Sequence, residues 1–437
     1  MDSTIRSRMK SLGVDVSDIL LPKKEIDYGR WAVVACDQFT SQKDYWQSVE
    51  LMTADHPSTY DLIFPECYLE DDDRQERIAR IEQSMKDYMD AGIFDTYREC
   101  TILVERSTSS GTRYGLMLAI DLEKYSYAPD SRSLVRATEG TILSRIPPRK
   151  EIRRNAMLEL PHIMVLISDM KRLVIEPLVA RRAELRCIYD TELMKGGGHV
   201  RGYLVDRDED LERMVEGLEA LYRSLDHSNP LMYAMGDGNH SLATARSLYE
   251  DLKKEIGTEA ALEHPSRYAL VEIENIFDPA LCFEAIHRVF FNTPVRLFDE
   301  TLGKICDSVM VETVPSLDEM RRRIDDADGS IAFGVIAEGR HMVYHVTSYR
   351  FALGASVIQS CIDTLTAAGG TSVDYIHGAD VTQRIANEGE NIGIIMSDIS
   401  KETFFDDIIR DGAFPRKTFS IGHAEEKRYY MEARRIR

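Results

Sequence analysis

The stretch Gly236-Asp237-Gly238-Asn239-His240 combines residue types that could bind an anion and move a proton. The strand-like run LMYAM precedes it, and the helix-forming run SLATARSLYEDLKKEI follows it. Gly238 and Asn239 would then offer backbone amides at a helix start, which attract phosphate or carboxylate. Asp237 could hold a metal ion or act as a base, and His240 could donate to an oxyanion or shuttle a proton. The alternative is structural: Asn239 caps the helix, the glycines form the turn, and His240 is a satisfied polar group.

The basic segment 132–154 is a second candidate site, because it holds seven Lys or Arg and two Glu in a chain of net charge −20. Phosphoryl transfer depends mainly on positioning and charge neutralisation. Arg136, Arg145 and Arg149 could clamp phosphates through bidentate hydrogen bonds. Glu139 lies among them in the sequence and could be a general base or a Mg²⁺ ligand. Equally, Glu139 could simply form a salt bridge with Arg136.

The stretch GAFPRKTFSIGH is a third candidate, in which Arg416 and Lys417 stand beside Thr418 and Ser420. Two cations and two hydroxyls within five residues suit a phosphate-binding loop or strand. The alternative is a basic surface strand whose phenylalanines pack inward.

Four further polar residues could join a site. Asp37 and Gln38 follow the apolar run WAVVAC, at the carboxyl end of an expected strand, where α/β proteins often bind ligands. Asn275 lies in ENIFDP, shortly before the turn-forming Asp-Pro pair, and His377 lies in YIHG, directly before a glycine. For each of them a capping or turn-forming role is an equal alternative.

Composition narrows the class of protein. A net charge of −20 disfavours nucleic acid and anionic membranes as partners, so a small molecule is the expected partner. The longest apolar runs fall short of the ~18 residues that span a membrane, and residues 1–18 have no continuous apolar core, so we expect a cytoplasmic protein. Seven cysteines without a CxxC pair and 11 histidines without HExxH spacing predict neither a disulfide framework nor a zinc centre. The oligomeric state stays open.

Strand and helix signals alternate along the 437 residues. TILVER and YGLMLAIDLE predict a hairpin, and LERMVEGLEALYRSL predicts a helix. The pattern favours an α/β fold of mixed sheets with flanking helices, with α+β left open. We expect an N-terminal region over 1–225, carrying the basic segment, and a C-terminal region over 226–437, carrying the Asp-Gly-Asn-His loop, or one integrated unit.

Eight ordered motifs between about residue 18 and residue 437 resemble the uncharacterised prokaryotic family catalogued as domain of unknown function 1015. They are WAVVACDQFTSQKDYW, PSTYDLIFPECYL, RATEGTILSRIPPR, ELPHIMVLISD, GDGNHSLATA, ENIFDPALCFEAIHR, VDYIHG and FPRKTFSIGHAEEKRYYMEAR. Many members carry Asp-Gly-His-His-Arg where this chain has Asp-Gly-Asn-His-Ser. This chain has Ser241 in place of that arginine, so other residues would have to hold a phosphate.

The same loop is similar to one in free-serine kinases of the ParB/sulfiredoxin-like superfamily, which pass a nucleotide phosphate to a small hydroxy amino acid. That resemblance implies a ParB/sulfiredoxin-like core and Mg²⁺ with ATP or ADP as cofactors. The leading hypothesis is a Mg²⁺-dependent phosphotransferase acting on a small hydroxylated metabolite, with Asp237, His240 and Glu139 as catalytic residues and Asp237 and Glu139 as metal ligands. The alternatives are a non-catalytic nucleotide- or metabolite-binding regulator and a metal-dependent hydrolase.

Overall fold

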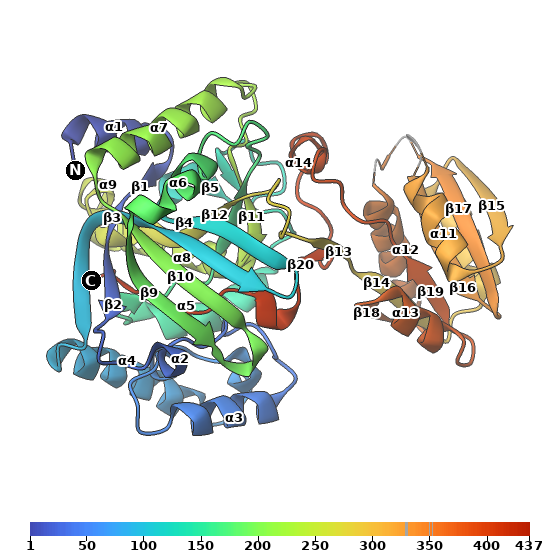
Figure 1. The fold of residues 1–437 in the computed structure, drawn as a ribbon. Helices are drawn as coiled ribbons and strands as arrows, with labels where there is room; N and C mark the ends of the chain where they lie inside the picture. The colour runs from blue at the N-terminus through green and yellow to red at the C-terminus, as the bar shows by residue number, and fades with distance from the viewer. Residues whose placement is uncertain (328–330, 349, 352) are drawn as a thin grey trace. The chain divides into compact units, whose positions relative to one another are not determined.

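The computed structural model describes residues 1–327, 331–348, 350–351 and 353–437. Contacts divide the chain into a first unit, Met1–Cys282 with Gly422–Arg437, and a second unit, Phe283–Ile421 (Figure 1). This division differs from the expected boundary after residue 225. That position lies inside the first unit, because Leu221 before it and Tyr233 after it belong to the same hydrophobic core.

Residues 1–282 and 422–437, all of which are described, form one sheet of eleven strands. In spatial order its main path is β5 (Tyr125–Ser126), β6 (Val135–Arg136), β11 (Tyr233–Asp237), β8 (Met164–Ile167), β12 (Tyr268–Asn275), β4 (Gly111–Asp121), β3 (Phe94–Thr108), β10 (Gly198–Val205) and β9 (Arg186–Leu193). Two more strands lie off this path, β1 (Val14–Asp15) beside β4 and β2 (Ser17–Pro22) beside β3. A separate antiparallel pair joins β7 (Leu158–Glu159) to β21 (Arg434–Arg435).

The sheet of the first unit has a hydrophobic core on each face, because side chains alternate along its strands. On β4, Leu116 and Leu118 belong to one core and Met117 to the other. Helices on the first face are α1 (Ser3–Ser11), α6 (Glu176–Ala180), α7 (Asp208–Arg223), α8 (Asn239–Ile256) and α9 (Thr258–Leu262). The second face packs against α2 (Tyr28–Trp31), α3 (Lys43–Thr53) and α4 (Arg74–Asp90) (Figure 1).

Strand directions are mixed, as the sequence predicts. Strand β8 pairs in parallel with β12 and antiparallel with β11, and the expected hairpin joins β3 to β4 with Thr108 opposite Gly111. The mixed α/β class is therefore confirmed. The expected strand over WAVVAC is not a ladder strand: within it Val34 alone forms a bridge, to Tyr429. Ala35 N donates to Arg428 O, and Tyr430 N donates to Val33 O, on either side of that bridge.

A left-handed glycine makes the turn from β11 into α8. Gly238 has a φ of +81° and serves as the N-cap residue of α8. A Cβ at this position would lie 3.0 Å from Ile163 Cγ1. Asn239 is the first residue of the helix, and its Oδ1 accepts from the backbone N of Thr138 at 3.1 Å. The structural alternative, in which Asn239 caps the helix, is therefore wrong.

We expect Gly238→Ala to lower the free energy of unfolding of the first unit by about 1–3 kcal/mol, because alanine resists this φ and would crowd Ile163. Urea unfolding followed by tryptophan fluorescence measures it, since both tryptophans, Trp31 and Trp46, lie in the first unit. Gly140→Ala is the matched control, because a Cβ there meets nothing within 4 Å. Equal stability of the two variants would contradict the prediction.

The second unit holds an antiparallel sheet of six strands among its described residues. In spatial order they are β15 (Ser308–Val314), β17 (Arg340–Thr347), β16 (Ile331–Ala337), β19 (Ile392–Ile395), β14 (His287–Phe291) and β18 (Ser372–Ile376). Helices α10 (Val295–Ile305) and α12 (Gly354–Ala368) cover one face, and α11 (Leu317–Asp325) and α13 (Ala379–Ala386) cover the other. A ribbon of β13 (Phe283–Ala285) and β20 (Phe419–Ile421) packs phenylalanines against α14 (Phe404–Asp411). None of the described helices has both the length and the apolar character needed to cross a membrane.

Candidate functional site

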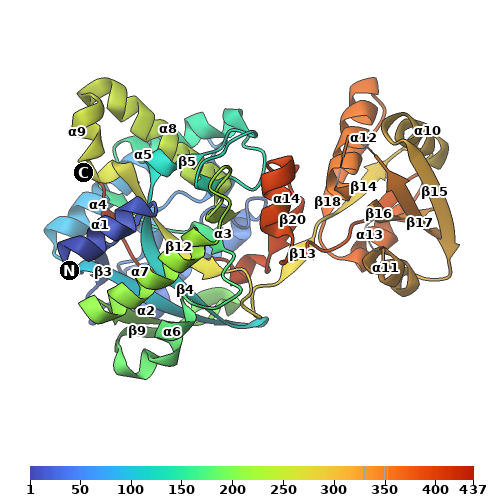
Figure 2. The same cartoon turned by 90° about the horizontal axis from the view of Figure 1, so that it is seen from above.

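The basic segment folds onto the Asp-Gly-Asn-His loop, which we call the elbow (residues 236–241). Besides the bond from Thr138 to Asn239, the backbone N of Ile142 donates to His240 Nε2 at 3.2 Å. The segment continues into α5 (Ile146–Arg154), which runs beside α8 (Figure 2). Lys150 of α5 donates to Ser247 at 3.1 Å and pairs with Asp251, both on α8. Two stretches about 100 residues apart in sequence therefore build one surface.

Positive charge gathers at the start of α8. The first amides of a helix have no partner within it, and the helix dipole adds a partial positive charge there. One of these amides, that of Gly238, donates to Asp237 Oδ1 at 2.9 Å. Lys427, whose side chain is 9% exposed, places Nζ 3.3 Å from Asp237 Oδ2. Both oxygens of Asp237 thus have partners in the protein, and an ammonium group stands beside the open amides.

A histidine that the sequence analysis did not select lies at the same place. His162 Nε2 is 2.8 Å from Ser241 Oγ and 4.0 Å from Asp37 Oδ2. Its Nδ1 lies 3.1 Å from the hydroxyl of Tyr430. A serine protease-like triad needs the carboxylate on the nitrogen that faces away from the serine. Here serine and aspartate share one nitrogen, so the arrangement is no such triad.

A small hollow opens beside these groups. Its volume is about 130 Å³, and its polar lining includes Glu66, Arg149, His162 and Ser241. Arg149 Nε donates to Glu66 Oε1 at 2.8 Å in a bidentate pair. Burial raises the pKa of Glu66, and the charge of Asp37 raises it further. The remaining lining is mainly apolar, from residues 62–64, 81, 85, 152, 156, 158 and 160.

His240 is neutral at physiological pH. Burial lowers its pKa to about 4, and the charges of Arg149 and Arg145 contribute to the shift. Its Nε2 accepts the amide of Ile142, so the proton of the neutral ring is assigned to Nδ1. A proton shuttle at neutral pH does not fit this ring, because Nε2 is occupied and protonation is disfavoured. Donation of a hydrogen bond from Nδ1 remains available.

We expect His240 to make stability fall in acid. Its pKa is lower in the folded state than the usual 6.5, so its contribution is complete above pH 6.5 and is lost as the pH falls toward 4. At pH 4.5 the wild type should have lost about 2 kcal/mol relative to His240→Gln, each compared with its own value at pH 7. Urea unfolding of both proteins at the two pH values measures the difference. Parallel acid losses in the two proteins would contradict the assignment.

The predicted arginines have different surroundings. Arg136 is 4% exposed and donates to Ser133 O, Asn229 Oδ1 and Pro230 O. Its guanidinium thus stabilises a turn, which removes it from the predicted phosphate clamp. Arg145 is exposed one turn before Arg149 on the elbow side, where its charge lowers the pKa of His240. Glu139 follows Thr138 directly and is half-buried.

Other predicted residues belong elsewhere. Asn275 is buried and donates to Asp169 O at 2.9 Å and to Glu176 Oε1 at 2.8 Å, so it is a turn former, the alternative stated for it. Arg416, Lys417 and His377 belong to the second unit. The first two lie over the ring of Tyr375 there. In the first unit, Gln38 Nε2 donates to Asp37 Oδ1 at 3.0 Å.

The donor set near the elbow fits Mg²⁺ only as a partner of bound phosphates. Among the described residues, no group of three or more His, Cys, Asp or Glu is arranged to hold a metal ion. Mg²⁺ commonly binds through one or two carboxylates together with substrate phosphates. Asp237 and Glu139 could supply such oxygens. A metal-dependent hydrolase, which would need a fuller set of protein ligands, gains no support from these residues.

Sequence reasoning missed several residues at the elbow, namely Glu66, His162, Ser241, Lys427 and Tyr430. A usable signal existed, because each stands in one of the eight motifs quoted above. His162 follows a proline just before the buried strand β8, and Glu66 follows a proline after an apolar run. Residue spacing could not show that these residues lie together in the fold, because their partners are 79 to 268 positions away in the sequence.

Residues 20–365 match the model of a family described as protein of unknown function (DUF1015). The chain belongs to this family. Among curated proteins, no match to this DUF1015 chain is found. Solved structures similar to the DUF1015 chain include a free serine kinase in complex with AMP, at 13% identity and a TM-score of 0.39, covering 72% of this chain and 90% of that one.

Two further solved structures resemble the DUF1015 chain. A conserved hypothetical protein from Pyrococcus furiosus has 13% identity and a TM-score of 0.35, covering 72% of this chain and 90% of that one. SbnI with a C-terminal truncation, from Staphylococcus aureus, has 10% identity and a TM-score of 0.33, covering 70% and 81%.

Proposed function

We propose that the elbow binds the phosphates of ADP or ATP with Mg²⁺ and passes a phosphoryl group to a small hydroxylated metabolite. One observation carries the proposal. The basic segment is fastened to the start of α8 by Thr138 and Ile142, so the first amides of α8, Lys427, Arg145 and Arg149 lie around one place. Carboxylates border that place, which suits a reaction that neutralises phosphate charge beside a base.

The phosphates would lie on the first turn of α8. The backbone N–H groups of this turn can donate hydrogen bonds to an anion. Lys427 adds a positive charge, and its ion pair with Asp237 holds it in place. Arg145 is exposed and free to reach a phosphate oxygen, and neutral His240 can donate from Nδ1. When bound, Mg²⁺ would neutralise phosphate charge, held by Asp237 and Glu139.

The acceptor would lie in the hollow. A volume of about 130 Å³ suits a compact molecule, not a whole nucleotide. Arg149 pairs with Glu66 and Lys427 with Asp237, whereas Asp37 has no Lys or Arg partner among the described residues. Asp37 would take the proton of the acceptor hydroxyl as the acceptor oxygen bonds to phosphorus. The bond between phosphorus and the bridging oxygen breaks, and the shortened nucleotide leaves with that oxygen.

A non-catalytic regulator is the second candidate. The pairing of Glu66 with Arg149 and of Asp237 with Lys427 favours it, because two carboxylates neutralised within the protein suit anion binding without chemistry. On this interpretation nucleotide binding would change the protein without forming a product.

Titration calorimetry with ADP and with ATP, each with Mg²⁺, tests the proposal. We expect binding to the wild type and at least tenfold weaker binding to Lys427→Met, with Lys304→Met, an exposed lysine of α10, as the unchanged control. Product analysis with a panel of small hydroxylated acids and amino acids follows. A phosphorylated product identifies the phosphotransferase, and binding without product identifies the regulator. If neither nucleotide binds, both interpretations are wrong.

A further inference from the structure

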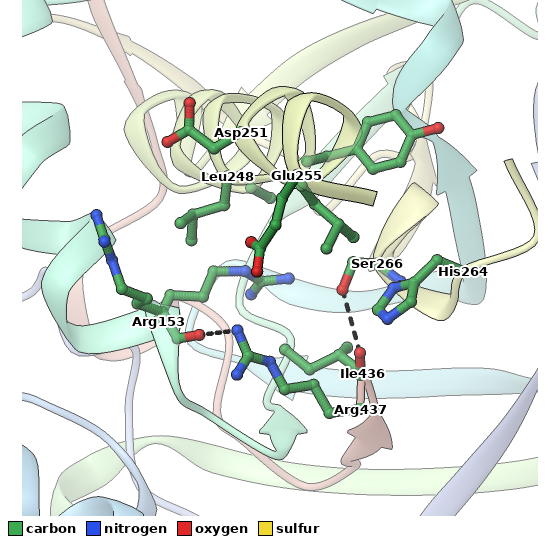
Figure 3. A pocket seen from close by; sticks show the side chains of 12 residues that line it. Arg153, Leu248, Asp251, Glu255, His264, Ser266, Ile436 and Arg437 are labelled. Carbon is green, nitrogen blue, oxygen red and sulfur yellow. Dashed lines mark hydrogen bonds between the residues drawn. The ribbon is translucent and has the colours of Figure 1, made fainter. Parts of the chain in front are cut away.

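A second, larger cavity lies in the first unit, on a different part of α8. Its volume is about 370 Å³, and it is enclosed by the end of α5, the later turns of α8, residues 264–266 and residues 436–437 (Figure 3). This size falls within the range of small-molecule sites, roughly 300–1,000 Å³. The elbow uses Ser241 in the first turn of α8, whereas this cavity extends from Ala245 to Glu255.

Charged groups line this cavity, and some of them have no partner among the described residues. Arg153 pairs with Glu159, and Asp251 pairs with Lys150. The Arg154 side chain, by contrast, makes no hydrogen bond or ion pair with any described residue, and it is exposed. Arg437 gives one N–H to the backbone O of Arg154 and has the rest of its guanidinium available.

The remaining lining of the cavity provides a further hydrogen-bond donor and an apolar surface, which we call the apolar floor (Leu248, Leu252 and Ile436). His264 Nδ1 accepts the amide of Ser266 at 3.2 Å, so its Nε2 carries the proton of the neutral ring. Burial and the nearby charge of Arg437 lower the pKa of His264, which keeps it neutral. Leu248, Leu252 and Ile436 supply apolar surface beside these donors.

We propose that this cavity binds an organic phosphomonoester, with its phosphate between Arg154 and Arg437 and its body on the apolar floor. Paired guanidiniums bind phosphate oxygens through bidentate bonds. Glu255, also without a partner among the described residues, faces the same cavity (Figure 3). The two guanidiniums balance the charge of one phosphomonoester, about −2 near neutral pH. Glu255 lowers the net positive charge of the cavity, which disfavours a more highly charged polyphosphate. This site is independent of the proposed function of the elbow.

Titration calorimetry of the full chain with phenyl phosphate tests the proposal. We expect binding that weakens at least tenfold, about 1.4 kcal/mol, in Arg154→Gln. The variant should fold normally, because the side chain of Arg154 has no partner among the described residues and its backbone bond to Arg437 is kept. Arg98→Gln, an exposed arginine of β3 that lines neither cavity, is the matched control and should bind as the wild type does. Inorganic phosphate, phenol and benzoate separate the parts of the ligand, and each should bind at least tenfold more weakly.

Three results would overturn the proposal. The first is an absence of phenyl phosphate binding at millimolar concentration. The second is weaker binding in Arg145→Gln together with unchanged binding in Arg154→Gln, which would place the ligand at the elbow. The third is equal binding of inorganic phosphate or of benzoate, which would exclude, respectively, a role for the apolar floor or a preference for phosphate.

Discussion

Replacing Arg428 with methionine should lower the free energy of unfolding of the first unit by about 3–5 kcal/mol. Arg428 is 4% exposed and pairs with Glu272 of β12 and with Glu432. Its Nε also donates to Pro161 O at 3.0 Å. Without the guanidinium, two buried carboxylates would lose the one cation that forms an ion pair with both of them. Urea unfolding followed by tryptophan fluorescence gives the value, since both tryptophans report on the first unit.

A control variant and a double variant show whether the loss of stability comes from the Arg428 ion pairs. Arg416→Met, an exposed arginine of the second unit, should leave the tryptophan transition unchanged. Glu272→Gln combined with Arg428→Met should recover part of the loss, because it removes one of the two stranded charges. A loss below 1 kcal/mol in Arg428→Met would mean that water or another group compensates the carboxylates.

Asp37→Asn should lower kcat for phosphoryl transfer by about 10²–10⁴-fold while leaving the nucleotide Kd unchanged. The substitution keeps the size of the side chain and removes only its ability to take a proton. This prediction rests on the proposed function. Steady-state kinetics with the best acceptor, together with calorimetric binding of ADP or ATP, separates the two quantities.

Asp44→Asn is the matched control for Asp37→Asn, since Asp44 is an exposed carboxylate nearby on α3. Its kinetics should equal those of the wild type. Asp37→Asn with full kcat would exclude Asp37 as the base. If Asp37→Asn lost nucleotide affinity as well, the residue would serve in binding and not in proton transfer.

Local features of the fold were predictable from the sequence. The strand, left-handed glycine and helix of the elbow follow from neighbouring residues, as does the hairpin of β3 and β4, because turn chemistry and periodicity act over short distances. The basic segment could be recognised as a candidate site because its positive charge contrasts with the net negative charge of the whole chain. Its contact with the elbow depends on the bonds of Thr138 and Ile142 to residues 101 and 98 positions away, which local sequence does not predict.

Long-range partners were not predictable in this way. Arg136 and Arg149 have similar sequence surroundings. Arg136 nevertheless stabilises a turn, whereas Arg149 lines the hollow. Lys427 meets Asp237 from 190 positions away, and no spacing rule connects the two. The boundaries of the second unit were hidden as well, because residues 283–421 continue the alternation of strands and helices without a linker composition.

The interruption of the first unit sets an order of events during translation. Residues 422–437 supply Lys427, Arg428 and Tyr430, and they leave the ribosome only after all of Phe283–Ile421 has been made. Where the interruption closes, Gly422 N donates to Cys282 O at 3.1 Å. While the second unit is being made, the sheet of the first unit therefore lacks Lys427 and Arg428, the ion-pair partners of Asp237 and Glu272. A ribosome stalled before residue 422 would hold a chain whose elbow is incomplete.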